Sequence, residues 1–246
     1  MLCSVSVVIP VYNEGESVIA TLEPIFDAIP ADAEVLVVYD MPEDTTAPVL
    51  QMLAVDEPRL RPLHNTLGPG PAQAIRSGLD EARAEVAVVT MGDSSDDPRQ
   101  IDALAQLVRD GAAVGVASRY MKGGRQIGGP LVKRTLSRLA GLSLYYLGRV
   151  GTHDATNSFK AYSTDFVREV GVESDQGFEI GIELVAKARR RRRRVAEIPT
   201  TWSDRTDGES RFKVAAWIPY YLRWYFYALG PADKAQANVK RVGEQA

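Results

Sequence analysis

The sequence predicts an α/β fold with a mostly parallel central sheet that is flanked by helices. Two apolar runs, at 5–11 and 34–39, are rich in β-branched residues, which is typical of strands covered on both faces. Each run stops at polar residues and is followed by a helical pattern, at 17–28 and from Thr45 onward. Two strand, loop and helix units in succession favour a parallel sheet.

The next segments continue this alternation as far as residue 120. Strands are predicted near 60–63, at 85–90 and at 113–118, with helices at 72–84 and 99–110. Gly68 and Gly70 lie in a Gly-Pro-Gly-Pro segment, which we interpret as a turn, although glycines there also allow a ligand to approach the backbone. The first 120 residues therefore predict a nucleotide-binding domain of the βαβ type.

The pattern changes after residue 120. An apolar-rich helix is predicted at 131–147, a loop and an edge strand at 154–163, a helix at 177–188, a strand at 195–198 and a polar loop at 200–212. Seven Trp, Tyr and Phe residues follow within the eleven residues 217–227.

The composition and net charge are those of an ordinary globular protein. The chain has 246 residues, 45% of them hydrophobic and 25% charged, which is ordinary for one large or two small globular domains. The net charge of −3 gives no indication of a nucleic-acid partner, although six arginines at 189–194 concentrate positive charge. The single cysteine, Cys3, excludes an intramolecular disulfide and fits a reducing compartment.

The strongest functional signal is the acidic loop after the strand that ends at Thr90. Asp93, Asp96 and Asp97 lie there within five residues, and open α/β sheets bind ligands beyond the carboxyl ends of their strands. Carboxylates suit Mg²⁺ or Mn²⁺, and such an ion commonly binds one or two carboxylates together with substrate phosphates. The alternative is a helix cap, because Asp followed by Pro98 suits a helix start. Both roles are compatible, with Asp93 facing a ligand and Asp97 capping.

Further acidic residues follow the first two strands, so several strand ends converge on one crevice. Asp40, with Asp44 beside it, suits hydrogen bonds from a ribose or a base edge, or alternatively an Asx-turn or helix cap. Glu14 either holds the base or ribose, or simply lies in the first helical turn, where the dipole favours a carboxylate.

Seven sequence blocks occur in an order that is familiar from one enzyme family. They are VVIPVYNE, the loop with Asp40 and Asp44, NTLGPGPAQAIRSGL, MGDSSDDP, ASRYMKGG, DATNSFKAY and EIPTTWSDRTDGESRF. In these blocks the chain resembles the family 2 glycosyltransferases, specifically the branch of dolichol-phosphate mannose synthases and polyprenyl-phosphate glycosyltransferases. The resemblance implies a GT-A fold, a nucleotide-diphospho-sugar donor (a GDP- or UDP-sugar), Mg²⁺ or Mn²⁺, and inversion at the anomeric carbon.

The resemblance also assigns roles by position. Around the nucleotide it places Pro10, Tyr12, Glu14 and Asp40, and Asp93 becomes the second acid of the family's D-x-D metal motif. The phosphate of the acceptor is assigned to Arg119, Lys133, Arg134 and Ser137. A loop that closes on the donor diphosphate contains Arg205 and Arg211. The residues expected to act in catalysis are Asp93, Arg119 and Arg205.

Three positions depart from the family pattern. Met91 replaces the first acid of D-x-D, Ser95 replaces a glutamine, and Tyr39 replaces the first acid after the second strand. Because methionine offers no oxygen, the ion would need Asp93 with Asp96, Ser95, or backbone and water. Either the acidic set has shifted or metal use is weakened, and we favour the shift because two further acids are present.

We therefore expect an inverting glycosyltransferase that moves a sugar to a polyprenyl phosphate. Its GT-A catalytic domain is 1–212, with a nucleotide-binding half at about 1–120 and an acceptor-binding half at about 121–212, and 213–246 form an aromatic helix and tail. A lipid phosphate is already ionised and needs no strong base. The alternatives are a hydroxyl acceptor, for which Asp154 or Asp96 would be the base, and a non-catalytic nucleotide-sugar-binding protein.

The aromatic segment raises the question of a membrane. The most apolar stretch, 214–229, has 16 residues, fewer than the roughly 20 that span a bilayer. It suits either core packing or a helix lying on a membrane surface. The arginines at 189–194 would add attraction to anionic headgroups, or form a solvated helix end. Without a signal peptide we expect a cytoplasmic protein whose membrane contact is peripheral.

Overall fold

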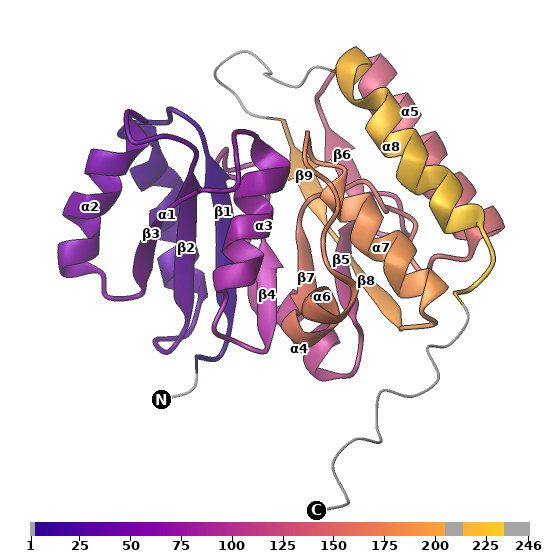
Figure 1. Ribbon diagram of the computed structural model, residues 1–246, viewed down its shortest axis with the longest axis horizontal. Helices are drawn as coiled ribbons and strands as arrows, with labels where there is room; N and C mark the ends of the chain where they lie inside the picture. Colours follow the sequence, from indigo (N-terminus) through magenta and orange to yellow (C-terminus); the bar gives the residue numbers. More distant parts are fainter. Residues whose placement is uncertain (1–2, 205–213, 234–246) are drawn as a thin grey trace, which may run out of the picture.

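The apolar runs form one seven-stranded sheet, whose strands lie side by side across Figure 1 from β3 to β8. The computed structural model describes residues 3–204 and 214–233. The strand order is β3-β2-β1-β4-β7-β5-β8. The strands are β1 (Ser6–Val11), β2 (Glu34–Tyr39), β3 (Leu60–His64), β4 (Val86–Val89), β5 (Val114–Ser118), β7 (Lys160–Ser163) and β8 (Val195–Pro199).

All neighbouring strands pair in parallel except at β7, which is antiparallel to both β4 and β5. The expectation of an edge strand in 154–163 is therefore wrong, because β7 lies inside the sheet. A lysine within a short strand is typical of an edge, but Lys160 and Ala161 are completely buried here. The carboxyl ends of β1, β2 and β4 meet at one edge of the sheet, as the parallel pattern predicts.

Helices cover both faces of the sheet. One core cluster contains the apolar side chains of α1 (Ser17–Ala28), α2 (Thr46–Asp56) and α4 (Ile101–Arg109). The other contains those of α3 (Pro71–Glu81), α6 (Thr164–Val170) and α7 (Ile180–Arg190), and it includes residues on both sides of residue 120. The helix expected at 99–110 begins with a 3₁₀ turn, Pro98–Gln100, in which Asp97 accepts a hydrogen bond from Arg99 N. Asp97 is thus a cap.

Two helices lie outside these layers at one end of the sheet. Helix α5 (Leu131–Ser143) continues as a π-helical turn, Leu144–Gly148, and α8 (Val214–Leu229) runs beside it (Figure 1). Trp224 and Ala228 of α8 are buried against the core, so part of the aromatic helix is core. The polar loop expected at 200–212 includes a short strand, β9 (Thr201–Ser203), which pairs in parallel with β6 (Arg125–Ile127).

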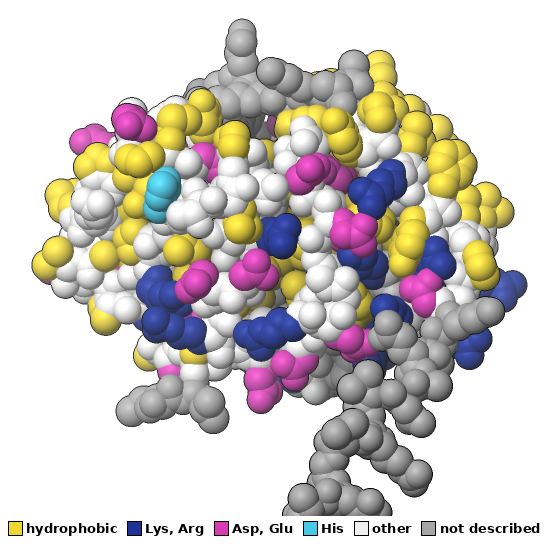
Figure 2. Space-filling model, viewed as in Figure 1, with side chains coloured by type: hydrophobic (Ala, Val, Ile, Leu, Met, Phe, Trp, Pro, Cys, Tyr) yellow, Lys and Arg dark blue, Asp and Glu magenta, His cyan; other side chains and the backbone are white. Residues whose placement is uncertain are grey.

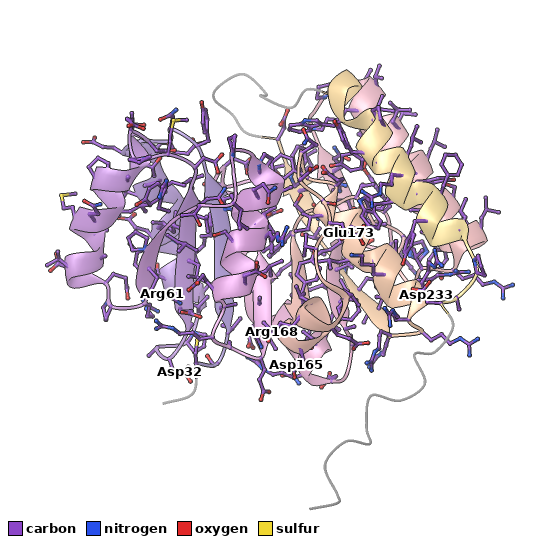
Figure 3. All side chains as sticks on the ribbon, in the orientation of Figure 1. Asp32, Arg61, Asp165, Arg168, Glu173 and Asp233 are labelled. Carbon is purple, nitrogen blue, oxygen red and sulfur yellow. The ribbon has the colours of Figure 1, made fainter. Side chains whose placement is uncertain are left out.

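The run of six arginines fastens α7 to the segment after α8. Arg190 and Arg191 both form ion pairs with Asp233, which lies just beyond α8 (Figure 3). Arg189 donates to the carbonyl oxygens of Gly148 and Gly230. The first half of the run is therefore occupied by contacts within the protein, and it is not simply a solvated helix end.

Candidate functional site

A cavity of about 940 Å³ lies at the sheet edge where the predicted site residues converge, and it extends between α5 and α8. Nine of the predicted residues line it: Pro10, Tyr12, Glu14, Asp40, Asp93, Asp96, Arg119, Lys133 and Ser137. Arg134 does not line this cavity and contributes to another one instead. Arg205 and Arg211 lie outside the described residues, although Asp204, directly before them, lines the cavity.

Asp40 organises one end of the cavity. Its two carboxylate oxygens accept hydrogen bonds from Asn65 Nδ2, at 2.9 Å, and from Gly70 N, at 2.8 Å. Gly70 has a φ of 117°, which strongly favours glycine, and Pro69, Gly70 and Pro71 all line the cavity. The Gly-Pro-Gly-Pro segment is thus both a turn and a wall that brings backbone close to a ligand.

Asp44 has a structural role. It is buried, and its carboxylate accepts hydrogen bonds from the backbone N–H groups of Asn13 and Thr46. These bonds hold the loop after β1 against the start of α2, so Asp44 fixes the loop that carries Tyr12 and Glu14.

The acidic loop after β4 places Asp93 and Asp96 in the cavity wall. Asp93 accepts a hydrogen bond from Ser95 N, while Asp96 accepts one from Thr90 Oγ1 at 3.0 Å and one from Met91 N. Desolvation, and then the negative charge of Asp93, raise the pKa of Asp96 to about 7. Ser95 lines the same wall, and its buried hydroxyl has no hydrogen-bond partner among the described residues. The loop therefore offers three oxygen-bearing side chains to a ligand.

Arg119 is held by a buried carboxylate. Asp154, which is completely buried, accepts bonds from Arg119 N at 3.0 Å, from Nε at 2.7 Å and from Nη2 at 2.9 Å. Burial works against both charges, but the attraction between them outweighs it. The pKa of Asp154 lies below its ordinary value and that of Arg119 above. The side-chain bonds to Asp154 come from Nε and Nη2, on one edge of the guanidinium, and Nη1 takes part in neither of them.

A cluster of hydroxyl groups surrounds Arg119. Ser137 Oγ of α5 accepts from Arg119 Nη2 at 3.2 Å and from Tyr120 OH at 3.0 Å, and it lies 2.6 Å from Thr156 Oγ1. Thr156 in turn donates to Asp154 Oδ1. Lys133 lies one helical turn before Ser137 and lines the same cavity. This region suits an anion with several oxygens.

Behind this cluster lies a buried lysine. Lys160 of β7 is completely buried and donates to the carbonyl oxygen of Ala155 at 3.2 Å. Desolvation lowers its pKa to about 7, against an opposing effect of the Asp154 carboxylate.

The other end of the cavity is apolar. Leu136 and Ala140 of α5 face Trp217, Ile218, Tyr221 and Leu222 of α8 across it, and Phe178 contributes to the same wall. The cavity thus joins a polar, charged part beside the sheet edge to a hydrocarbon-lined part between two helices.

Several of these residues could not be predicted from the sequence. Thr156 and Asn157 lie in the DATNSFKAY block, but no pattern assigned them to the cavity. The pairing of Asp154 with Arg119 joins residues 35 positions apart, and no local signal indicates it. Phe178 and the α8 residues could be recognised only as apolar.

The family model of Glycosyl transferase family 2 matches residues 6–171 of the chain. Among curated proteins, the undecaprenyl-phosphate mannosyltransferase of Micrococcus luteus is 30% identical over 83% of this chain and 85% of its own length. The polyprenol monophosphomannose synthase of Mycolicibacterium smegmatis is also 30% identical, over 86% of this chain and 85% of its own.

Solved structures have the same fold. The glucosyl-3-phosphoglycerate synthase of Mycobacterium tuberculosis, in complex with Mn²⁺, UDP and glucosyl-3-phosphoglycerate, aligns with a TM-score of 0.68 and 16% identity over 94% of this chain and 81% of that chain. A mannosyltransferase of Pyrobaculum calidifontis, in complex with GDP-mannose and Mn²⁺, aligns with a TM-score of 0.61 and 18% identity over 90% of this chain and 62% of that chain.

Proposed function

Because the chain belongs to glycosyl transferase family 2, we propose that its cavity transfers a sugar from a nucleotide diphosphate to a polyprenyl phosphate, with inversion at the anomeric carbon. The observation that carries the proposal is the joining of two environments in one cavity. Arg119, Lys133 and Ser137 suit a phosphate, and the apolar channel between α5 and α8 starts beside them. A lipid phosphate needs both environments, whereas a sugar hydroxyl needs only polar groups.

The donor would lie beside the sheet edge. Asp40, Tyr12 and Glu14 surround the space for the nucleoside, and Pro69, Gly70 and Pro71 close it. Arg205 and Arg211 are proposed to neutralise the diphosphate, as the resemblance implies.

A divalent ion fits the acidic loop only with help from the donor. Asp93 and Asp96 offer carboxylates, and Ser95 offers a hydroxyl that has no partner within the part of the chain that the structure describes. All three are hard oxygen ligands suited to Mg²⁺ or Mn²⁺. Within the described residues no three His, Cys, Asp or Glu side chains are placed to hold a metal. Diphosphate oxygens would therefore complete the coordination. When bound, the ion supplies positive charge to the leaving diphosphate.

The acceptor is a nucleophile that is already charged. One oxygen of the lipid phosphate attacks the anomeric carbon, the bond from that carbon to the diphosphate oxygen breaks, and the electron pair leaves with the nucleoside diphosphate. Arg119 and Lys133 hold the phosphate in line, and no proton has to be removed. A hydroxyl acceptor would need a base. Of the two candidates, Asp154 is unsuited because it is buried in its pair with Arg119, and Asp96 lines the cavity but is proposed here as a ligand of the divalent ion.

Membrane contact is part of the proposal. Helices α5 and α8 expose apolar side chains beside the open channel, which Figure 2 shows gathered at the upper right. The most exposed are Leu131, Val132 and Leu139 of α5, Tyr146 and Leu147 of the π-helical turn that follows it, and Phe226 of α8. None of the helices in the described ranges is long and apolar enough to cross a bilayer. We propose that this face lies on the membrane surface, where the lipid acceptor enters the channel.

Substitution of Lys133 tests the acceptor site. Lys133→Gln removes one charged hydrogen bond to the acceptor phosphate, which is worth about 1.5–3 kcal/mol. We expect kcat/KM for a short-chain polyprenyl phosphate to fall about tenfold to a hundredfold, with unchanged affinity for the nucleotide in calorimetry. Arg192→Gln, which removes an exposed arginine lining neither cavity, is the control. A loss of nucleotide affinity in Lys133→Gln, or equal activity in both variants, would contradict the assignment.

A further inference from the structure

A second cavity, of about 700 Å³, lies on the opposite side of α5 from the acceptor region. The two faces of the helix follow from its period. Lys133, Leu136, Ser137 and Ala140 line the first cavity, and Arg134, Thr135, Arg138 and Leu139 line the second. Lys133 and Arg134 are adjacent in the sequence, but they line different cavities.

The second cavity is strongly basic. Arg125 of β6 and Arg134 and Arg138 of α5 line it together with Arg119, and no carboxylate residue of the described chain lines it. Arg125, Arg134 and Arg138 form no ion pair and no side-chain hydrogen bond within the described residues. Most other described arginines contact a carboxylate or a backbone carbonyl, for example Arg61, Arg109, Arg168, Arg193 and Arg223.

Unpaired like charges one helical turn apart destabilise a helix. Arg134 and Arg138 stand at this spacing on α5, and Arg125 faces the same space. A bound anion with several oxygens would remove the repulsion, and planar guanidinium groups match phosphate oxygens in pairs. We therefore expect the three arginines to be more stable in this arrangement with a bound phosphate group than without one.

The rim of the cavity indicates where the phosphate comes from. Leu139 is 60% exposed and Ile127 is 56% exposed, and both line it. A free phosphate ion would leave these side chains in water, whereas the headgroup of a membrane lipid would bring acyl chains to cover them. The exposed leucines of α5 continue this apolar surface beyond the cavity.

We propose that the cavity of Arg125, Arg134 and Arg138 binds the phosphate of an anionic membrane lipid, apart from the acceptor site. This lipid site is a different cavity from that of the proposed reaction, and lipid binding can be measured without donor or acceptor. The lipid would orient α5 on the bilayer so that the apolar channel opens toward the acyl chains.

Vesicle binding tests the proposal. The full chain is mixed with vesicles of phosphatidylcholine alone or of phosphatidylcholine with phosphatidylglycerol, and bound protein is measured by sedimentation. Each basic residue near an anionic surface contributes about a fivefold factor, so Arg134→Gln/Arg138→Gln should lower the partition coefficient for anionic vesicles about 30-fold. Binding to neutral vesicles should change little.

A second double variant distinguishes lipid binding at this cavity from a general effect of net charge. Arg192→Gln/Arg193→Gln removes two arginines that line neither cavity, and it should leave most of the binding intact. Circular dichroism and thermal unfolding check that both variants fold. Equal losses in the two pairs, no loss in the first pair, or arginine-dependent binding of inorganic phosphate without vesicle binding would each overturn the proposal.

Discussion

Asp154 is the residue on which the orientation of Arg119 depends. Its carboxylate accepts three hydrogen bonds from Arg119 and is completely buried. We expect Asp154→Asn to lower the free energy of unfolding by about 3–5 kcal/mol, because it leaves a buried charge without its partner. Chemical denaturation measures this, and the KM for the acceptor should rise as well.

An exposed ion pair provides the control for Asp154. Asp165 is 91% exposed and lies 3.5 Å from Arg168 (Figure 3), so Asp165→Asn should cost less than about 1 kcal/mol. If the two variants were equally stable, the Asp154 pair would not hold the site together.

Lys160 makes stability depend on pH. Its pKa is about 7 in the folded chain and near 10.5 when exposed, so the unfolded chain binds more protons between these values. The free energy of unfolding therefore gains from this lysine as pH rises from 7 to 10.5, by at most about 1.4 kcal/mol per pH unit. Lys160→Met should lack this gain and be the more stable protein at pH 7. Parallel stability curves for the two proteins would refute the account.

At the residue scale, the sequence identifies groups that end strands but not groups that meet across the fold. Asp93 and Asp40 follow apolar runs, so their place at the sheet edge could be predicted. The Asp154 pair and buried Lys160 could not, because both depend on tertiary contacts made by β7. Lys160 in particular resembles a solvent-facing residue in the sequence.

At the scale of elements, α5 carries one wall of both cavities, and Gly141 fixes its position. A Cβ at Gly141 would lie 2.4 Å from the carbonyl oxygen of His153, directly before Asp154. Alanine normally stabilises a helix by about 1 kcal/mol relative to glycine, but Gly141→Ala should destabilise here and should raise the KM for the acceptor.

Thermal unfolding measures whether Gly141→Ala destabilises or stabilises the protein. Thr135→Ala, at an exposed position of the same helix, should change the unfolding temperature little or raise it. A higher unfolding temperature for Gly141→Ala would mean that α5 does not press against the loop before Asp154.

The strands and helices were largely predictable because their patterns are long and regular. The main exception, β7, has four residues and a lysine, which is too little pattern to distinguish the middle of a sheet from its edge. Helix α6, the short strands β6 and β9 and the π-helical turn after α5 were missed for the same reason.

At the scale of the whole molecule, the chain is a family 2 glycosyltransferase with a GT-A fold, as its sequence blocks predict. What no sequence pattern revealed is that α5 and α8, about 80 residues apart in the chain, enclose one channel and expose one apolar face. Trp224 and Ala228, which are buried in the core, hold α8 in this place. The half-exposed ion pair of Glu173 with Arg223 adds only a small contribution.

The central claim is that the acceptor is a lipid phosphate. The most direct test is sugar transfer from GDP- and UDP-sugars, with Mn²⁺ or Mg²⁺, to a short-chain polyprenyl phosphate and to the corresponding polyprenol. We predict a glycosylated lipid from the phosphate with at least one donor and no product from the alcohol. Transfer to the alcohol, with none to the phosphate, would contradict the claim.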